Sequence, residues 1–343
     1  HRGDGHPEDP VTHPASLSRV VDPDPLNGGC CSPDRLLLRD HDAALHGSMN
    51  TAPAIEVTNL TKRYGDRNVV DDLTFDVRSG ETFALLGPNG AGKSTTIEIL
   101  EGFRTATSGT VRVLGEDPAR GGADWRGRIG VVSQSSADIE RYSARELLRH
   151  FASLYPAPRG VDDTIERCGI SSFASHRVSR LSGGQKRRVD VALGIIGNPE
   201  VLFLDEPTTG FDPQARREFW ALIEQLKSEG MTMVLTTHYL DEADHLGDRA
   251  GIIVAGKRIE IGDMASLGGP ESRKPRVRWL EGDEWHEQQT HLPGTLVRSL
   301  IDRLGPEPTE LTVTRPSLEE VYLEIIGEGP THPLSITDRK SVV

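Results

Sequence analysis

The sequence predicts an α/β fold, in which a mainly parallel β-sheet is covered by helices and followed by a small α+β domain. Short apolar runs bounded by Gly or polar residues are typical of buried parallel strands. Such runs occur at Glu81–Leu86, Val201–Leu204 and Met233–Thr236, with helical segments between them. After Leu267 the pattern changes to short strand-like and amphipathic segments. We therefore expect one large sheet-based domain and a second, smaller one.

The small domain begins after a polar, Pro-containing linker at Pro270–Lys274. Strand-like segments at Arg276–Leu280 and Glu310–Thr314 lie on either side of a helical segment, Leu296–Leu304. A last helix is predicted over Ser317–Ile326, where S-x-x-E forms a capping box and apolar residues recur along one helix face. Together these segments predict an α+β unit of about sixty residues.

Composition limits the possible classes of function. The chain has 343 residues, of which 36% are hydrophobic, enough for one large and one small domain. Its formal net charge of -13 disfavours an electrostatic nucleic-acid binder, so we expect no nucleic-acid partner. Cys30, Cys31 and Cys168 fit neither a disulfide framework nor a zinc site, which is typical of a reducing cytoplasm. No apolar run reaches the length of about 18 residues that a membrane span needs, and no signal peptide is evident.

Both ends of the chain lack the pattern of folded structure. Residues 1–48 are rich in Pro, Gly, Asp and His without periodicity, so we predict a disordered leader. Met49 stands directly before the first organised segment, and we expect the native protein to start there. We assign no role to the tail at 330–343, since Asp338–Val343 is what a common sequencing adapter encodes.

A glycine-rich loop follows the first apolar run and precedes a predicted helix. Gly87 and Gly92 permit backbone conformations in which consecutive N–H groups hold phosphates at a helix N-terminus. Lys93 can reach the β- and γ-phosphates, and Ser94 offers a hydroxyl to Mg²⁺. The loop therefore predicts nucleotide binding. The residues predicted to contact the nucleotide here are Gly87, Pro88, Asn89, Gly90, Ala91, Gly92, Lys93, Ser94 and Thr95.

Two carboxylates follow the apolar run Val201–Leu204. This spacing places Asp205 and Glu206 at the carboxyl edge of a buried strand, where ligands bind in parallel sheets. We expect Asp205 to hold Mg²⁺ and Glu206 to polarise the attacking water.

Other polar residues follow apolar runs or precede the loop. His238 ends the run after the two acids, where it can sense the γ-phosphate and help to hold the water; a surface histidine is the alternative. Gln134 follows another run and can contact the metal and the water, although polar residues are ordinary at that position. Tyr64 can stack on adenine, and a core or surface tyrosine fits its spacing equally well.

The segment Leu181–Gln185, L-S-G-G-Q, predicts a second phosphate-binding surface. Ser182 supplies a hydroxyl, while Gly183 and Gly184 supply accessible N–H groups at the start of a helix. A serine-capped helix explains the same residues, and both interpretations can hold together. One nucleotide cannot easily use two such surfaces from one compact domain, which points to a second copy of the chain.

These motifs resemble those of the ATP-binding cassette (ABC) ATPases over roughly Ile55 to Leu267. Gly210–Pro213 also resembles the D-loop of that family, although Phe211 stands where Leu is more usual. The six ordered matches are Tyr64 at the adenine-stacking position, Gly87–Thr95 (Walker A), Gln134 (glutamine loop), Leu181–Gln185 (signature), Val201–Glu206 (Walker B) and His238 (switch histidine).

The resemblance implies a P-loop NTPase fold with a mainly parallel sheet core, an antiparallel β subdomain and a helical subdomain. It implies an ATP-binding domain at 54–268 and a small C-terminal accessory domain at 275–329. ATP and Mg²⁺ are the implied cofactors, and two chains form a head-to-tail homodimer in which each signature meets the nucleotide of the other. The implied roles are catalysis by Glu206, His238 and Gln134, metal binding by Ser94, Gln134 and Asp205, and nucleotide contact by Ser182, Gly183, Gly184, Gln185 and Asp212 besides Tyr64 and the loop.

Longer strings resemble the exporter ATPases of the daunorubicin-resistance type. They are L-S-G-G-Q-K-R-R-V-D-V-A-L-G, D-E-P-T-T-G-F-D-P and T-T-H-Y-L-D-E-A-D, and Ser317–Leu323 resembles that subfamily's ending. The resemblance implies a separate membrane permease, met by a helical subdomain that includes Arg145–Tyr155. It also implies a place at the cytoplasmic face of the cell membrane and efflux of a drug-like or lipid-like cargo. An importer ATPase and a soluble cassette protein of translation or repair remain alternatives.

Overall fold

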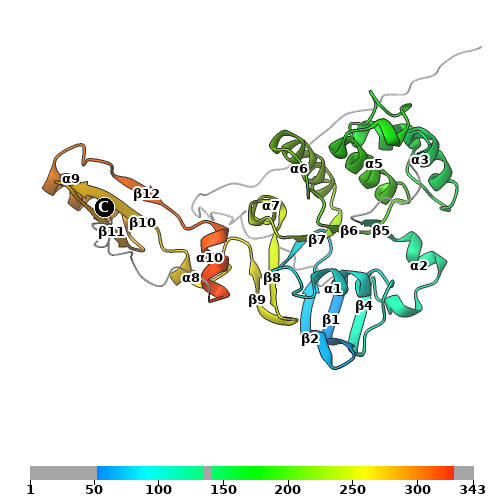
Figure 1. Ribbon diagram of the computed structural model, residues 1–343, viewed down its shortest axis with the longest axis horizontal. Helices are drawn as coiled ribbons and strands as arrows, with labels where there is room; N and C mark the ends of the chain where they lie inside the picture. The colour runs from blue at the N-terminus through cyan, green and yellow to red at the C-terminus, as the bar shows by residue number, and fades with distance from the viewer. Residues whose placement is uncertain (1–51, 134–140, 328–343) are drawn as a thin grey trace, which may run out of the picture. The chain divides into compact units, whose positions relative to one another are not determined.

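The computed structural model describes residues 52–133 and 141–327, and its centre is a six-stranded sheet in the order β5-β6-β7-β3-β8-β9 (Figure 1). The first five of these strands run parallel, and β9 pairs antiparallel with β8. The predicted mainly parallel sheet is therefore confirmed. In sheet order the strands are β5 (Ile129–Val132), β6 (Val201–Asp205), β7 (Thr232–Thr237), β3 (Thr82–Leu86), β8 (Arg249–Val254) and β9 (Lys257–Asp263).

Helices cover both faces of this sheet because its central strands are apolar on both sides. Successive strand residues point to opposite faces. Val201 and Phe203 belong to a buried cluster with α1 (Lys93–Leu100) and the antiparallel strands. Leu202 and Leu204 belong to a second cluster, with α5 (Gly183–Ile195) and α6 (Pro213–Ser228). The continuous apolar run is thus explained by burial on two sides.

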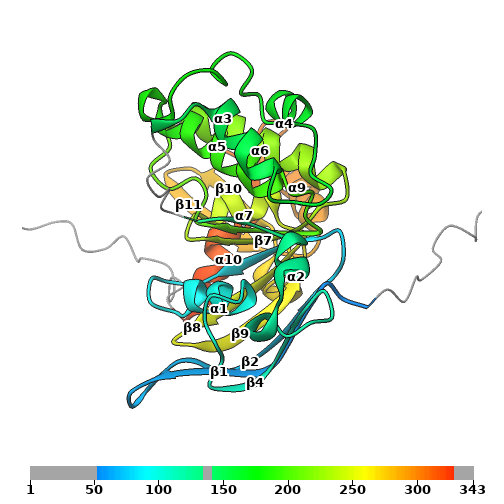
Figure 2. The ribbon, with the colours of Figure 1, turned by 90° about the vertical axis from the view of Figure 1, so that its right-hand side faces the viewer.

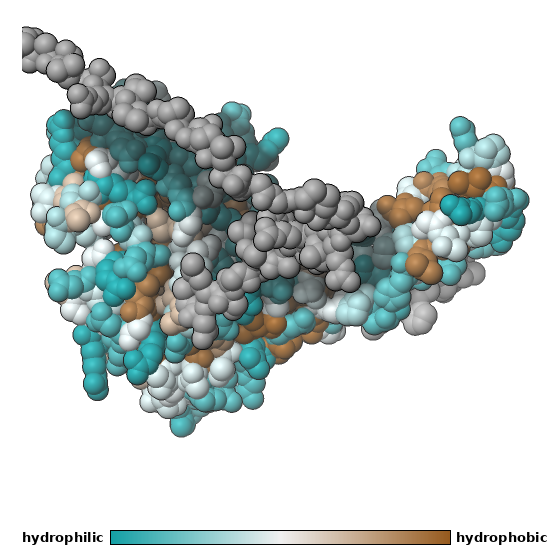
Figure 3. All heavy atoms as spheres, turned by 180° about the vertical axis from the view of Figure 1, so that it is seen from behind, coloured by the Kyte–Doolittle hydropathy of each residue, from teal (hydrophilic) through white to brown (hydrophobic). Residues whose placement is uncertain are grey.

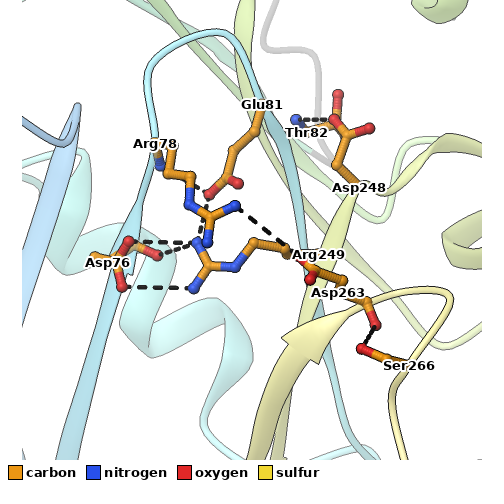
Figure 4. Close-up of polar contacts among 8 residues, drawn as sticks. All are labelled: Asp76, Arg78, Glu81, Thr82, Asp248, Arg249, Asp263 and Ser266. Carbon is orange, nitrogen blue, oxygen red and sulfur yellow. Dashed lines mark hydrogen bonds and ion pairs between the residues drawn. The ribbon is translucent and has the colours of Figure 1, made fainter. Parts of the chain in front are cut away.

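An antiparallel three-stranded sheet, order β2-β1-β4, lies below α1 in Figure 2. Its strands are β1 (Ile55–Tyr64), β2 (Arg67–Val77) and β4 (Ser108–Val113). Arg249 on β8 links it to the central sheet, since its Nη1 lies 3.3 Å from Asp76 Oδ2 on β2 and 2.9 Å from Oε1 of the buried Glu81, which precedes β3 (Figure 4). The antiparallel subdomain implied by the family resemblance is present.

A helical region surrounds the second apolar cluster. It contains α3 (Ala144–Ala152), which lies in the segment predicted to be helical, together with α4 (Val161–Arg167), α5 and α6. Ser143 and Glu146 form a capping box that starts α3. The remaining short helices of the cassette are α2 (Ala123–Gly127), α7 (Leu240–Leu246), η1 (Pro118–Arg120) and η3 (Val178–Arg180).

The C-terminal part contains a small sheet, order β11-β10-β12, that packs on α9 through Val277, Trp279 and Leu300. Its β11 was not predicted, because this polar and mostly exposed edge strand shows no apolar alternation. Figure 3 shows one face of the molecule, where hydrophilic residues predominate and apolar residues form separate patches. The elements are α8 (Gly269–Ser272), β10 (Arg276–Glu281), β11 (Glu284–Gln289), α9 (Pro293–Leu304), β12 (Thr312–Thr314) and α10 (Leu318–Ile325).

Helix α10 packs against the cassette. Ser317 and Glu320 form the predicted capping box at its start. Leu318 and Tyr322 share a buried cluster with Leu86 of β3 and residues of β8. None of the helices in the described ranges has the length and apolar character that a bilayer span requires.

Candidate nucleotide site

The phosphate loop joins β3 to α1 and depends on two glycines. A Cβ at Gly87 would lie 2.2 Å from the Ile253 carbonyl oxygen, and a Cβ at Gly92 would lie 2.5 Å from that of Val69. Gly92 also has a φ of 103°, in the left-handed region. The neighbouring strands thus leave room only for glycine, which explains the spacing seen in the sequence. Because α1 begins at Lys93, the loop lies at a helix N-terminus, where anions bind.

Lys93 lies beneath this loop and is 5% exposed. Its Nζ donates to the carbonyl oxygens of Gly87 at 2.7 Å and Pro88 at 3.2 Å. Burial lowers the pKa of Lys93, while the carboxylates of Glu206 and Asp205 oppose that shift. The structure therefore brings the lysine of the loop close to the two predicted acids. Ser94 is exposed at the same helix start, and Thr95 beside it is half-buried.

The two acids are fixed by the adjacent strand β7. The Thr236 hydroxyl contacts Asp205 Oδ1, and the Glu206 backbone N–H lies 3.1 Å from both the hydroxyl and the carbonyl oxygen of Thr236. Glu206 has a φ of 43°, in a region that residues other than glycine rarely adopt. Such a conformation costs on the order of 1–3 kcal/mol and persists only where the surroundings hold it, often at functional sites.

The side chain of Glu206 meets the predicted switch histidine. Glu206 Oε2 lies 3.4 Å from His238 Nδ1 and accepts the Thr209 hydroxyl at 3.3 Å. The His238 side chain is 35% exposed, so this edge of the sheet is accessible from solvent. The structure thus brings together the loop lysine, the two acids and the histidine. Gln134 lies outside the described residues.

Tyr64, at the end of β1, is 43% exposed. It pairs with Arg67 on β2, and two residues further along that strand the Val69 carbonyl lies against Gly92. This pairing places Tyr64 near the phosphate loop. Arg104 Nη1 donates to the Tyr64 hydroxyl at 3.0 Å, and Lys62 Nζ lies 5.1 Å from the ring centroid.

The signature segment forms the start of α5. Ser182 caps this helix and forms a capping box with Gln185, so the serine-capped helix is confirmed. Ser182 and Gly183 remain exposed, and Gly184 is half-buried. Within the described ranges, the side-chain hydrogen bonds of this segment stay inside its own capping box, and Figures 1 and 2 place α5 and α1 in different subdomains. Asp212 caps α6 through the N–H groups of Gln214 and Ala215.

Glu101 is an ionisable residue that the sequence analysis missed. It ends α1, is 8% exposed and lines a cavity of about 540 Å³ with Phe103, Phe151 and Tyr155. Burial, reinforced by Asp205 and Glu98, raises the pKa of Glu101 to about 8. The available signal was a carboxylate directly after Ile97, Ile99 and Leu100, the apolar residues of the helix predicted after the glycine-rich loop. We name the cavity the Glu101 groove.

Comparison with known proteins agrees with this site. A family model described as ABC transporter matches residues 70–209. The chain is 38% identical over 304 residues to the Nod factor export ATP-binding protein I of Burkholderia orbicola (strain AU 1054), an alignment that covers 81% of this chain and 98% of that protein. The chain belongs to the ABC transporter family. The resemblance seen in the motifs is therefore confirmed, and the chain is an ABC ATPase that binds nucleotide and hydrolyses ATP.

One further relative and two solved structures align with this ABC ATPase over nearly their whole length. The daunorubicin resistance ATP-binding protein DrrA3 of Streptomyces coeruleorubidus is 34% identical, with 80% of this chain and 96% of that protein covered. A solved ATP-binding subunit of an ABC transporter aligns with a TM-score of 0.60 and 24% identity, over 80% of this chain and 99% of that one. A dimeric bacterial ABC transporter cassette aligns with a TM-score of 0.55 and 25% identity, over 61% and 98%. The predicted fold is confirmed.

Proposed function

We propose that this ABC ATPase is the motor subunit of an exporter, which acts as a homodimer with Mg²⁺ and a separate membrane permease. One observation carries the proposal: Lys93, Glu206 and His238 converge at one sheet edge, while the signature surface at Ser182–Gly184 belongs to another subdomain. One chain therefore supplies a nucleotide-holding surface and a signature surface, and these two surfaces cannot both contact the same nucleotide. Two chains related head to tail would complete two sites.

Hydrolysis would use Glu206 as the base that accepts a proton from the attacking water. His238 and Thr209 both contact Oε2 of this carboxylate and so fix its orientation. Lys93 supplies positive charge for the β- and γ-phosphates, and loop N–H groups supply further donors. Positioning and charge stabilisation account for most of the catalysis in phosphoryl transfer.

The side-chain oxygens at the sheet edge are suitable ligands for Mg²⁺. This cation prefers oxygen ligands and keeps several waters, so that one or two protein oxygens suffice beside the phosphates. Ser94 offers an exposed hydroxyl, and Asp205 offers a carboxylate that the Thr236 hydroxyl orients. When bound, the ion would neutralise charge on the phosphates. Gln134 is the third proposed ligand.

The Glu101 groove supports docking of a permease. It lies between the helical region, which contributes Phe151 and Tyr155, and the sheet, which contributes Ile129 and Gly130. Phe103 at its rim is 72% exposed, so its aromatic ring is accessible to a partner at the groove. A short amphipathic helix of the permease would bury its apolar face there against Phe103, Phe151 and Tyr155. Docking of this kind would hold the ATPase at the cytoplasmic face of the membrane.

The export direction is supported by the relatives that align over nearly their whole length. Their names describe Nod factor export and daunorubicin resistance. A lipid-like or drug-like cargo is the corresponding proposal for this chain. No described contact favours an importer or a soluble cassette protein over an exporter.

Co-expression with a membrane permease encoded by an adjacent gene tests this function. Inverted membrane vesicles that hold both proteins should accumulate a fluorescent amphiphilic drug in an ATP-dependent manner, and vesicles with the Glu206→Gln variant should not. The ATPase should remain with the membrane fraction only when the permease is present. Equal membrane association with and without the permease would contradict the proposed partnership.

A further inference from the structure

Arg187 connects the signature helix to the Walker B segment within one chain. It lies near the start of α5, and its side chain is buried, with 7% exposure. Nε donates to the Pro207 carbonyl at 2.9 Å, Nη2 donates to the Asp205 carbonyl at 3.0 Å, and Nη1 donates to the Ser133 carbonyl. One guanidinium therefore holds the main chain at the ends of both β5 and β6.

Two of these carbonyls bracket the proposed catalytic base. The Asp205 carbonyl belongs to the peptide bond directly before Glu206, and the Pro207 carbonyl follows one residue later. Glu206 keeps its φ of 43° under contacts from two sides. Thr236 holds its N–H from β7, and Arg187 holds the flanking carbonyls from α5. Arg187 thus helps to maintain the main-chain conformation that aims the Glu206 carboxylate.

The charge of Arg187 is compensated although it is buried. Asp190 Oδ2 lies 3.8 Å from Nη1, and the carboxylates of Asp190, Asp205 and Glu242 oppose the lowering of the Arg187 pKa by burial. Packing does not require such a charge, since an apolar residue of similar volume often gives equal or greater stability. What an apolar residue lacks is a planar fork of donors directed at three carbonyls.

We propose that Arg187 is a positioning residue that couples the signature surface of a chain to the hydrolytic carboxylate of the same chain. Ser182 lies about 7.5 Å from Arg187 along the axis of α5, little more than one helical turn away. Displacement of α5 when Ser182 meets a nucleotide would shift the Asp205 and Pro207 carbonyls, and Glu206 with them. Because this role rests on the proposed homodimer, each nucleotide would adjust the base that serves the other.

Three variants separate coupling from folding. Arg187→Met keeps an unbranched stem but removes all donors, and Arg187→Lys keeps the charge without the fork. Arg188→Met is the matched control, since Arg188 is the next residue of the same helix and pairs instead with Glu218 at 2.9 Å. Steady-state hydrolysis gives kcat and KM, and size-exclusion chromatography with ATP in the Glu206→Gln background gives dimer formation.

We expect Arg187→Met to lower kcat at least about tenfold while KM changes less than about threefold, because the phosphate loop is untouched. Arg187→Lys should fall between this variant and wild type, and Arg188→Met should stay within about twofold of wild type. The ATP-dependent dimer should persist in both Arg187 variants, since the signature surface is intact.

Equal kcat losses at positions 187 and 188 would overturn the coupling role. So would a rise in KM that matches the kcat loss, or loss of the dimer, because Arg187 would then support only binding or the signature surface. If Arg187→Met does not fold, the kcat, KM and dimer formation of Arg187→Lys are compared with those of Arg188→Met instead. A wild-type chain that neither hydrolyses ATP nor dimerises with it would instead refute the proposed function, and the coupling with it.

Discussion

His238 Nδ1 lies 3.4 Å from Glu206 Oε2, although the two residues follow different strands. The contact arises because β6 and β7 are adjacent and parallel, so that their carboxyl ends meet at one edge of the sheet. Glu206 and His238 each follow one of these apolar strands, and the pairing of the strands brings the two side chains into contact. The same edge holds Asp205, and Lys93 at the start of α1 reaches it after the loop that follows the neighbouring strand β3.

Replacing Glu206 with Gln should lower kcat by about 10²–10⁴-fold, because an amide cannot accept the proton of the attacking water. ATP binding should remain, and an ATP-dependent dimer should accumulate. Phosphate release and size-exclusion chromatography provide the measurements. Glu200→Gln, one residue before β6, is the control and should keep near wild-type turnover, since Glu200 is exposed and pairs with Arg128. Hydrolysis by the Glu206 variant at a near wild-type rate would disprove the assignment.

Replacing Ser182 with Arg should abolish turnover without loss of ATP from the same chain, because the long cation blocks the surface that meets the partner's nucleotide. Ser317→Arg is a matched control, since Ser317 is also an exposed N-cap residue with a capping box. Both changes remove a cap worth about 1 kcal/mol. Equal turnover in the two variants would argue against a role of Ser182 beyond capping.

Replacing Lys93 with Ala should weaken nucleotide binding itself, by about tenfold or more, because the loop loses its only buried ammonium among the described residues. Titration with a fluorescent ATP analogue measures the change. Lys257→Ala provides the comparison, since Lys257 forms an exposed ion pair with Asp71. If the Lys93 variant bound the ATP analogue with unchanged affinity, the phosphates would not bind at this loop.

Glu101 predicts a pH-dependent stability. Its folded-state pKa of about 8 exceeds the usual value of 4.5, so between these values the folded state binds more protons than the unfolded state. Stability is then fully present below about pH 4.5 and falls as the pH rises toward 8. Glu101→Gln should remove this slope and exceed wild-type stability at pH 9 by on the order of 2 kcal/mol.

Urea unfolding at pH 5 and pH 9 measures this difference. Glu98→Gln serves as the control, since Glu98 lies on the same helix but pairs with Arg104 at the surface. A Glu101 variant that shows the wild-type pH slope would mean that Glu101 is ionised throughout this range.

Local pattern was sufficient to predict where the glycine-rich loop and the two acids lie in the fold. At Gly87 and Gly92 any side chain would collide with a neighbouring strand, so these positions require glycine and the requirement can be read from the sequence. The carboxyl ends of buried strands likewise appear as apolar runs that stop at polar residues. The serine cap of α5 was predictable for the same reason, because capping depends on residues only three apart.

Features that depend on distant segments were not predictable from local pattern. Arg187 resembles any basic residue of an exposed helix until folding brings three main-chain carbonyls to its guanidinium. The burial of Glu101 depends on how the helical region closes over α1. Edge strand β11 pairs through its backbone, so its polar side chains carry no strand signal.

Phe103 should be needed for the permease but not for basal hydrolysis. It is 72% exposed at the rim of the Glu101 groove and contributes no atom to the site around Glu206. Phe103→Asp should therefore reduce permease co-purification at least about tenfold, since a buried aromatic anchor can supply 2 kcal/mol or more of binding free energy. Leu292→Asp, which changes an apolar residue of similar exposure, 67%, directly before α9, should leave co-purification unchanged. Loss of permease binding in both variants, or in neither, would contradict docking of the permease at the Glu101 groove.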